Sequence, residues 1–292
     1  MISVLIPTYN YTCYKLVSDI HEQLELSGVK YEVIVAEDGS KDQVAIIANH
    51  KIEELSNCRH IIRTENLGRA GIINYLISEA KGEWCIIMDS DARVVTDNFV
   101  SIYIENVKDD ADLVIGSLVN PDTLPHPDAT LRYIYEKAAE SYHTVEYRNR
   151  HVYERFTTFN FMGRRSVLLE VPFDERCTEY GFEDTLMGVE MRRKGKRVKH
   201  IENPLMHLGF DSNEVFLNKT RTALRSLKKI EQDMLPYTRM GKMIRKIEKL
   251  HMKPVVRMCY SLLCPLIVYN LSGKHPNLKL FAFYKLGYYL SL

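Results

Sequence analysis

The first half of the chain alternates short apolar runs with segments in which apolar residues recur every three or four positions. Five runs predict buried strands, at residues 2–6, 32–36, 60–63, 84–88 and 113–117. Continuous apolar strands alternating with helical patterns are typical of a parallel sheet covered on both faces. We therefore predict an α/β fold, with a mostly parallel central sheet flanked by helices.

The helical segments begin and end at recognisable residues. Ser40 followed by Gln43 has the pattern of a capping box, which predicts a helix with Val44, Ile47 and Ile52 facing inward. Residues 68–80 predict another helix, ended by Gly82. Further helical patterns cover residues 131–145, 184–194 and 214–234.

A change of composition after Pro236 predicts a domain boundary. We expect one domain over residues 1–235, divided into halves at 1–118 and 119–235. Residues 236–292 are basic and apolar and predict a C-terminal helical extension.

Overall composition excludes some classes of protein. The chain has 292 residues, 46% of them hydrophobic and 26% charged, so global disorder is not expected. A formal net charge of +1 argues against a general nucleic-acid binder. The 6 cysteines include no Cys-x-x-Cys pair and predict reduced core thiols. A strand beginning at Ile2 leaves no place for a signal peptide, so we expect a cytoplasmic protein.

Two aspartates, Asp89 and Asp91, follow the apolar run at residues 84–88. Such a strand has no packing use for two charges at its end. Carboxylates at i and i+2 can point to the same side and hold Mg²⁺ or Mn²⁺, which often accompany a phosphate-bearing substrate. In open α/β sheets, ligands bind at the carboxyl ends of the strands. This pair is therefore a candidate site for a divalent metal.

Four motifs, in their order and spacing, carry a resemblance to a known family: Ser3-Val-Leu-Ile-Pro-Thr-Tyr-Asn10, Ala36-Glu-Asp-Gly-Ser40, Asn66-Leu-Gly-Arg-Ala70 and Met88-Asp-Ser-Asp-Ala92. Together they resemble the family 2 glycosyltransferases, which have the GT-A nucleotide-diphospho-sugar transferase fold. Residues 160–186 resemble the later half of galactosyltransferase-like and chondroitin-polymerase-like members. The resemblance covers about residues 1–210 and implies an enzyme that transfers a hexosyl or hexosaminyl group.

The resemblance also implies which residues bind the donor. Asp38 would hydrogen-bond the base of a nucleotide, most simply the uracil of a UDP-sugar, and Asp91 would hold the metal. Asp38 also fits a purely structural role in a turn, and Arg69 fits either a diphosphate contact or an ordinary surface position. The implied donor-binding residues are Pro7, Thr8, Tyr9, Asp38, Arg69, Asp89, Ser90 and Asp91.

Glu183 and Asp184 open a predicted helix, where acidic residues also stabilise the helix dipole. The resemblance implies that Asp184 is the general base and that Glu183 binds the acceptor. His207 stands where GT-A enzymes often supply a further metal ligand, beside Asp91 and Asp89. A core position explains His207 about equally well. His200 lies among basic residues and is expected at the surface.

The implied reaction is a metal-assisted single displacement that inverts the anomeric centre, with a glycan or lipid-linked hydroxyl as acceptor. One alternative is a nucleotide-sugar-binding protein without catalysis. A nucleotidyltransferase is a second alternative, disfavoured because Pro7 and its neighbours stand where a glycine-rich loop would be expected.

The C-terminal segment combines basic and apolar residues. No acidic residue follows Glu248, and residues 258–273 carry no charge. That run is short for a membrane span, but basic charge beside apolar residues fits peripheral contact with an anionic membrane through residues 240–292. We therefore expect contact with the inner face of the cytoplasmic membrane. A helical appendage packed on the catalytic domain is the other interpretation.

Overall fold

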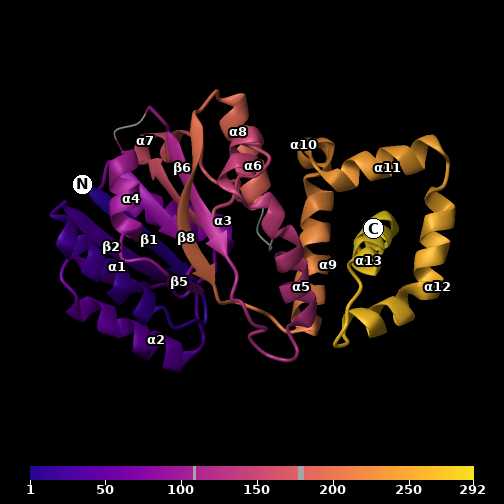
Figure 1. Cartoon of the computed structure of the whole chain (residues 1–292), viewed down its shortest axis with the longest axis horizontal. Helices are drawn as coiled ribbons and strands as arrows, with labels where there is room; N and C mark the ends of the chain where they lie inside the picture. The colour runs from indigo at the N-terminus through magenta and orange to yellow at the C-terminus, as the bar shows by residue number, and fades with distance from the viewer. Residues whose placement is uncertain (108–109, 177–180) are drawn as a thin grey trace. The chain divides into compact units, whose positions relative to one another are not determined.

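The computed structural model describes residues 1–107, 110–176 and 181–292. These residues form two compact units (Figure 1). The first, called here the sheet unit, comprises the described residues within 1–120, 142–178 and 183–209. The second, the helical unit, comprises those within 121–141, 179–182 and 210–292. The predicted domain boundary after residue 235 falls inside the helical unit and stays a prediction.

The sheet unit is built on one curled, mixed sheet with the strand order β3-β2-β1-β4-β7-β6-β8-β5. Neighbours pair in parallel from β3 to β4 and between β6 and β8, whereas β7 and β5 are antiparallel to their neighbours. The described strands are β1 Ile2–Thr8, β2 Tyr31–Glu37, β3 Cys58–Ile62, β4 Trp84–Met88, β5 Ala92–Val94, β6 Leu113–Val119, β7 Asn160–Arg164 and β8 Val198–His207. The predicted α/β class with a helix-flanked sheet is confirmed.

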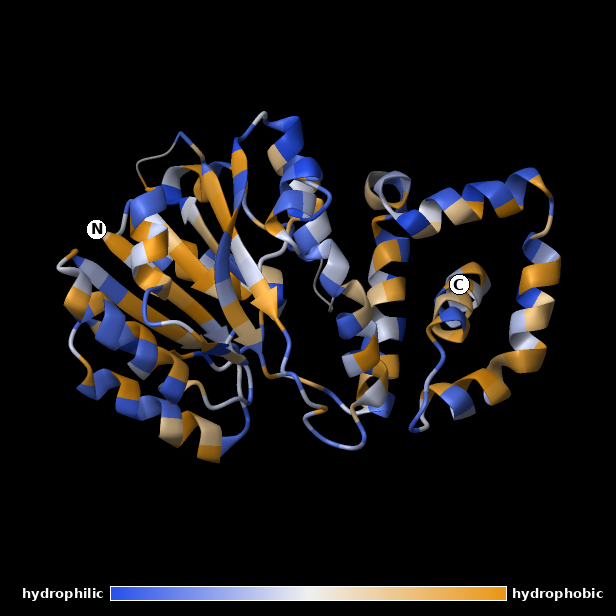
Figure 2. Ribbon diagram, viewed as in Figure 1, coloured by the Kyte–Doolittle hydropathy of each residue, from blue (hydrophilic) through white to orange (hydrophobic). Residues whose placement is uncertain are grey.

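Alternate residues of the central strands face two separate hydrophobic layers, as the period of two in a strand requires. Val4 and Ile6 of β1 face one layer, and Leu5 between them faces the other. Helices α1 and α4 pack against the first layer, while α3, α7 and α8 pack against the second. The strands are therefore buried on both faces, which explains their continuous apolar runs; Figure 2 shows them as mostly hydrophobic.

The helices of the sheet unit are α1 Tyr14–Ser27, α2 Gln43–His50, α3 Gly68–Glu79, α4 Phe99–Asn106, α6 Val145–Arg150, α7 Arg165–Glu170 and α8 Glu183–Arg193, with a 3₁₀ turn at Lys51–Glu54. Helices α3 and α8 begin within one residue of their predicted starts.

The helical unit has its own hydrophobic core. Its α-helices are α5 Thr130–Ala139, α9 Asn213–Lys229, α10 Glu231–Met234, α11 Arg239–Lys249, α12 Lys253–Leu271 and α13 Leu278–Ser291. Helices α9, α11 and α12 surround α13 (Figure 1). Phe281 and Tyr284 of α13 pack with Phe216 of α9 and with Tyr260 and Ile267 of α12. The C-terminal segment is thus folded into this unit.

The prediction for the helix after Ser40 was wrong in its start and for two of its inward residues: Val44 and Ile47 are exposed, whereas Ile52, in the 3₁₀ turn after α2, is buried as predicted. Asp42 caps α2, accepting hydrogen bonds from the backbone N–H of Val44 and Ala45. The helix therefore buries Ala45, Ile46 and Asn49. Buried Asn49 accepts a hydrogen bond from the backbone N–H of Cys13 at 2.8 Å, so a polar residue occupies a position that the apolar pattern passes over.

The expectation that His200 lies at the surface was also wrong. The His200 side chain is buried on β8, and its Nε2 lies 2.8 Å from the carbonyl oxygen of Val152. Burial lowers its pKa to about 4, with the nearby Arg148 adding to the effect. Basic neighbours in the sequence do not imply that His200 is exposed, because successive residues of a strand face opposite sides of the sheet.

The observed orientation of α2 predicts opposite outcomes for two adjacent isoleucines. Ile46 is 8% exposed and Ile47 is 67% exposed. Ile46→Ala should lower the free energy of unfolding by about 2–3 kcal/mol, because it leaves a cavity. Ile47→Ala, the matched control, should change it by less than about 0.5 kcal/mol. Urea unfolding measures both, and the reverse ranking would mean that α2 faces the other way.

Candidate functional site

The carboxyl ends of three neighbouring parallel strands, β2, β1 and β4, meet at one edge of the sheet. Thr8 ends β1, while Asp38 and Asp89 follow β2 and β4 directly. The backbone N–H of Asp38 donates to the carbonyl of Thr8 at 2.8 Å, and that of Asp89 donates to the carbonyl of Phe159 at 3.1 Å. Residues from distant parts of the sequence are thus brought together at the edge where α/β folds bind ligands.

Asp38 is buried and connects β2 to the start of α3. Its Oδ1 accepts a hydrogen bond from the backbone N–H of Leu67 at 2.7 Å. Burial raises the pKa of Asp38, and the backbone hydrogen bonds of the Leu67 loop oppose that shift. Gly39 follows with φ at 70°, and a Cβ there would lie 2.7 Å from the backbone nitrogen of Asn66. Only glycine fits this turn without displacing the loop.

The other predicted donor residues line the same edge with different exposure. Pro7 and Thr8 are buried, and the Thr8 hydroxyl donates to the carbonyl of Tyr11 at 3.0 Å. Tyr9 is 53% exposed, so its ring is free to contact a ligand. Ser90 is half-buried between the two aspartates.

Arg69, near the start of α3, forms ion pairs with three carboxylates. Its Nη2 lies 2.6 Å from Asp89 Oδ1, and its Nη1 lies 3.3 Å from Asp184 Oδ1 and 3.4 Å from Glu183 Oε1. The Arg69 side chain is 23% exposed. It is therefore part of a built cluster that joins Asp89, a predicted donor-binding residue, to the two acids of α8, and it is not an ordinary surface arginine.

Thr158, just before β7, completes this cluster. Arg69 donates to its hydroxyl at 2.6 Å, and that hydroxyl donates to Asp184. Thr158 is not among the site residues predicted from the sequence. The only available signal is its position before the run at 160–164, since β7 is antiparallel to β4 and therefore begins at the edge where β4 ends.

The cluster holds one guanidinium, that of Arg69, and three carboxyl groups, those of Asp89, Glu183 and Asp184. The single positive charge cannot balance three ionised carboxylates. Burial raises the pKa of Glu183 to about 7, with adjacent Asp184 adding to the shift and Arg69 opposing it. Burial likewise raises the pKa of Asp89 to about 6. For Arg69, burial disfavours the charge, but the three carboxylates outweigh it and raise the pKa. The cluster is therefore poised to hold a proton near neutral pH.

The Asp91 carboxylate lies beside the end of β8. The His207 Nε2 lies 3.5 Å from Asp91 Oδ2, and the backbone N–H of Leu208 donates to the carbonyl of Asp91 at 2.8 Å. A Cβ at Gly209 would lie 1.8 Å from Asp91 Oδ2, so this glycine makes room for the carboxylate. The strand pairing of Ala92 with His207 fixes this arrangement.

Two of the three predicted metal ligands therefore lie together. Among residues 1–107, 110–176 and 181–292, no group of three His, Cys, Asp or Glu side chains is arranged to hold a metal ion. Mg²⁺ and related ions are commonly bound by one or two carboxylates together with substrate phosphates and water. Asp91 and His207 fit such a partial ligand set, whereas Asp89 is paired with Arg69. The predicted three-residue set stays a prediction.

Tyr180, which precedes Glu183 and Asp184 in the segment 160–186 that resembles the family, lies outside the described residues. Cys177 lies outside them too. The remaining five cysteines are free, and Cys13 and Cys85 among them are buried, as the sequence predicts for core thiols.

Comparison with known families identifies the chain. The profile of "Glycosyl transferase family 2" matches residues 3–172, more than half of the chain. The chain belongs to this family. All residues described above at the strand ends, and Arg69 and Thr158, lie within the matched region. Glu183, Asp184 and His207 lie beyond it. The predicted likeness of the later half to galactosyltransferase-like and chondroitin-polymerase-like members stays a prediction.

Curated family 2 relatives resemble only part of this chain. The chain is 34% identical over 123 residues to "Glycosyltransferase GlyG" of Streptococcus pneumoniae serotype 4, covering 42% of this chain and 40% of that protein. It is 32% identical over 121 residues to the dolichol-phosphate mannosyltransferase of Pyrococcus furiosus, covering 40% of this chain and 32% of that protein. These matches thus span at most two fifths of either relative's length.

Solved structures extend the likeness of fold to nearly the whole chain. The mannosyltransferase PcManGT from Pyrobaculum calidifontis, in complex with GDP-Man and Mn²⁺, superposes with a TM-score of 0.54 at 16% identity. That comparison covers 99% of this chain and 84% of the other. At such identity the likeness establishes the fold alone, and the predicted GT-A fold is confirmed.

The raised pKa of Glu183 predicts a pH-dependent stability. A carboxyl whose pKa is higher in the folded state favours folding at low pH, and that contribution is lost as the pH rises from about 4.5 to about 7. Glu183→Gln should therefore be more stable than wild type at pH 8, by about 1–3 kcal/mol, and similar to it at pH 4. Urea unfolding across this range measures the difference.

Glu190→Gln, on the same helix α8 but with the side chain 33% exposed, is the control and should leave the difference between pH 4 and pH 8 unchanged. An unaltered pH profile for Glu183→Gln would mean that Glu183 has the same pKa in the folded and the unfolded protein.

Proposed function

We propose that this chain is an inverting glycosyltransferase. It moves a hexosyl or hexosaminyl group from a nucleoside diphosphate sugar, most simply a UDP-sugar, to a hydroxyl of a glycan or lipid-linked acceptor. One observation carries the proposal: Arg69 and Thr158 hold Asp184 next to Asp89, at the strand edge that also presents Asp38 and Asp91. A cytoplasmic location remains part of the proposal.

The donor would lie along the strand edge from Asp38 to Asp91. The base of the nucleotide contacts Asp38 and the exposed ring of Tyr9, and Ser90 and Asp89 face the sugar-diphosphate part. Asp91 and His207 would hold the divalent metal, Mn²⁺ or Mg²⁺. When bound, this ion neutralises charge on the departing diphosphate.

Asp184 then acts as the general base. It takes the proton of the acceptor hydroxyl, whose oxygen forms a bond to the anomeric carbon as the bond from that carbon to the diphosphate oxygen breaks. The Asp184 side chain is 33% exposed, against 9% for Glu183, so a hydroxyl can reach it more easily. Thr158 donates to Asp184 and fixes its orientation. Glu183, whose Oε2 is buried and makes no hydrogen bond to the described residues, is placed to accept one from an acceptor.

A binding protein without catalysis would need the donor-binding residues alone. The acids of α8, joined to Asp89 through Arg69, favour the enzyme. A nucleotidyltransferase would need phosphate-binding basic residues after β1. Here Tyr9 and Asn10 lie there instead.

Donor and metal binding should depend on Asp91. A panel of UDP-sugars and GDP-mannose, with and without Mn²⁺, should contain one donor that raises the melting temperature of the wild type by at least about 3 °C with metal. Asp91→Ala should abolish that shift, because it removes a metal ligand. Asp97→Ala, an exposed aspartate six residues along, is the control and should retain it. A full shift in Asp91→Ala would remove Asp91 from the metal site.

Catalysis should depend on Asp184 without a matching effect on donor binding. Asp184→Asn should lower the turnover number by about 10²–10⁴-fold, because the base is lost, while the donor-induced thermal shift remains. The assay is release of nucleoside diphosphate from the donor in the presence of alkyl glycosides. Turnover within about threefold of wild type would assign the base elsewhere; retention of anomeric configuration in the product would contradict single displacement.

A further inference from the structure

Helix α12 of the helical unit presents an apolar stripe to solvent. Its residues follow the 3-4-4-3 spacing of one helix face and are between 45% and 83% exposed. The stripe consists of Val255, Met258, Leu262, Leu266 and Tyr269. An apolar face of five such side chains on one helix is unusual for a surface in contact with water and indicates an interaction site.

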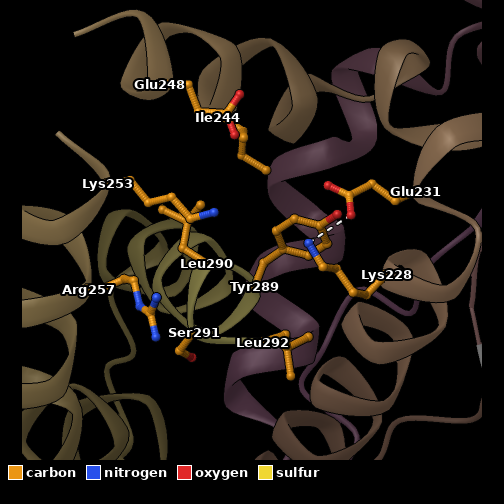
Figure 3. Close-up of a pocket in the computed structure, with 10 residues that line it drawn as sticks. All are labelled: Lys228, Glu231, Ile244, Glu248, Lys253, Arg257, Tyr289, Leu290, Ser291 and Leu292. Atoms are coloured by element: carbon orange, nitrogen blue, oxygen red, sulfur yellow. Dashed lines mark ion pairs between the residues drawn. The ribbon is translucent and has the colours of Figure 1, made fainter. Parts of the chain in front are cut away.

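The opposite face of α12 packs in the core of the helical unit. Tyr260, Ile267 and Leu271 are buried in the core shared with α13. Nearer the start of the helix, Lys253 and Arg257 line a polar cavity of about 190 Å³, together with Glu231, Glu248 and the last residues of α13 (Figure 3). Lys228 forms an ion pair with Glu231 at the same cavity.

This packing bears on how α12 could meet a lipid bilayer. By length and composition, α12 is the one helix of the described residues that could cross a membrane, which is weak evidence taken alone. Crossing would carry Lys253, Arg257 and the polar cavity into hydrocarbon, at a high cost in free energy. A helix that lies along the interface and inserts only its apolar stripe keeps these groups in the protein.

Along the chain, the charged side chains from residue 249 onward have a single sign. From residue 249 to the last residue there are six lysines and arginines and no acidic residue: Lys249, Lys253, Arg257, Lys274, Lys279 and Lys285. Helix α11, directly before α12, adds exposed Lys242, Arg245 and Lys246 on the side opposite buried Ile244. Cations therefore stand before and after an apolar stripe in the chain.

We propose that the apolar stripe of α12 docks this protein on the interface of a membrane rich in anionic phospholipids. The stripe enters the region between headgroups and acyl chains, and the basic residues of α11 and of the segment after α12 attract the anionic headgroups. A second copy of this chain is a poorer occupant, because two segments of the same positive sign would be brought together.

Binding to vesicles tests the proposal with the full chain. Wild type should sediment with vesicles of phosphatidylcholine mixed with phosphatidylglycerol and much less with phosphatidylcholine alone, and added salt should weaken the binding. The double variant Leu262→Glu/Leu266→Glu should lower partitioning onto anionic vesicles by at least about tenfold.

The matched control changes two equally exposed apolar residues in the sheet unit. Leu26 and Val44 are 82% and 78% exposed, so replacing them should not disturb the core. Leu26→Glu/Val44→Glu adds two negative charges, the same number as Leu262→Glu/Leu266→Glu. It should stay within about threefold of wild type. Melting temperature and the donor-induced thermal shift, measured on both double variants, should be unchanged; this separates loss of docking from loss of fold or of nucleotide binding.

Three results would overturn the proposal. Wild type could remain in the supernatant with anionic vesicles at low salt. The two double variants could bind vesicles equally. Light scattering could show a wild-type dimer that Leu262→Glu/Leu266→Glu converts to a monomer, which would make the stripe an interface between copies. Because none of these measurements involves sugar transfer, they stand apart from a failure of the proposed activity.

Discussion

The candidate site depends on one guanidinium that neutralises carboxylates from separate parts of the chain. Asp89 follows β4, and Glu183 and Asp184 open α8, almost a hundred positions later. Three carboxylates that each lie within 3.4 Å of one guanidinium repel one another strongly in a partly buried site. The positive charge of Arg69 offsets this repulsion. Even so, one positive charge does not balance three negative ones, which is why burial and mutual repulsion keep the pKa of Glu183 and of Asp89 high.

This shared cation also couples the two sides of the site. A ligand that breaks the ion pair between Asp89 and Arg69 leaves the guanidinium paired only with Asp184 and Glu183. A ligand that breaks the ion pairs of those two acids leaves it paired only with Asp89. Coupling of this kind is reciprocal, since each ligand changes the affinity for the other by the same factor.

The sequence predicts five of the eight strands of the sheet, several helices and the strand-edge residues, because these depend on local apolar periodicity and on where runs end. It fails where a tertiary contact decides. Asn49 faces inward because Cys13 offers a donor to it, and His200 is buried because β8 lies inside the sheet. Thr158 and the triple pairing of Arg69 arise only when β7, an antiparallel strand inserted between β4 and β6, places its start beside α8 and α3. The spacing of these residues along the chain does not predict that they come into contact.

Gly209 shows how a residue without a side chain can limit the adaptation of this protein. The carboxylate of Asp91 occupies the volume that a Cβ at position 209 would need. A side chain at position 209 would therefore require the Asp91 carboxylate to move from its place beside His207. The position of the Asp91 carboxylate beside His207 is therefore set in part by an absent side chain two residues beyond that histidine.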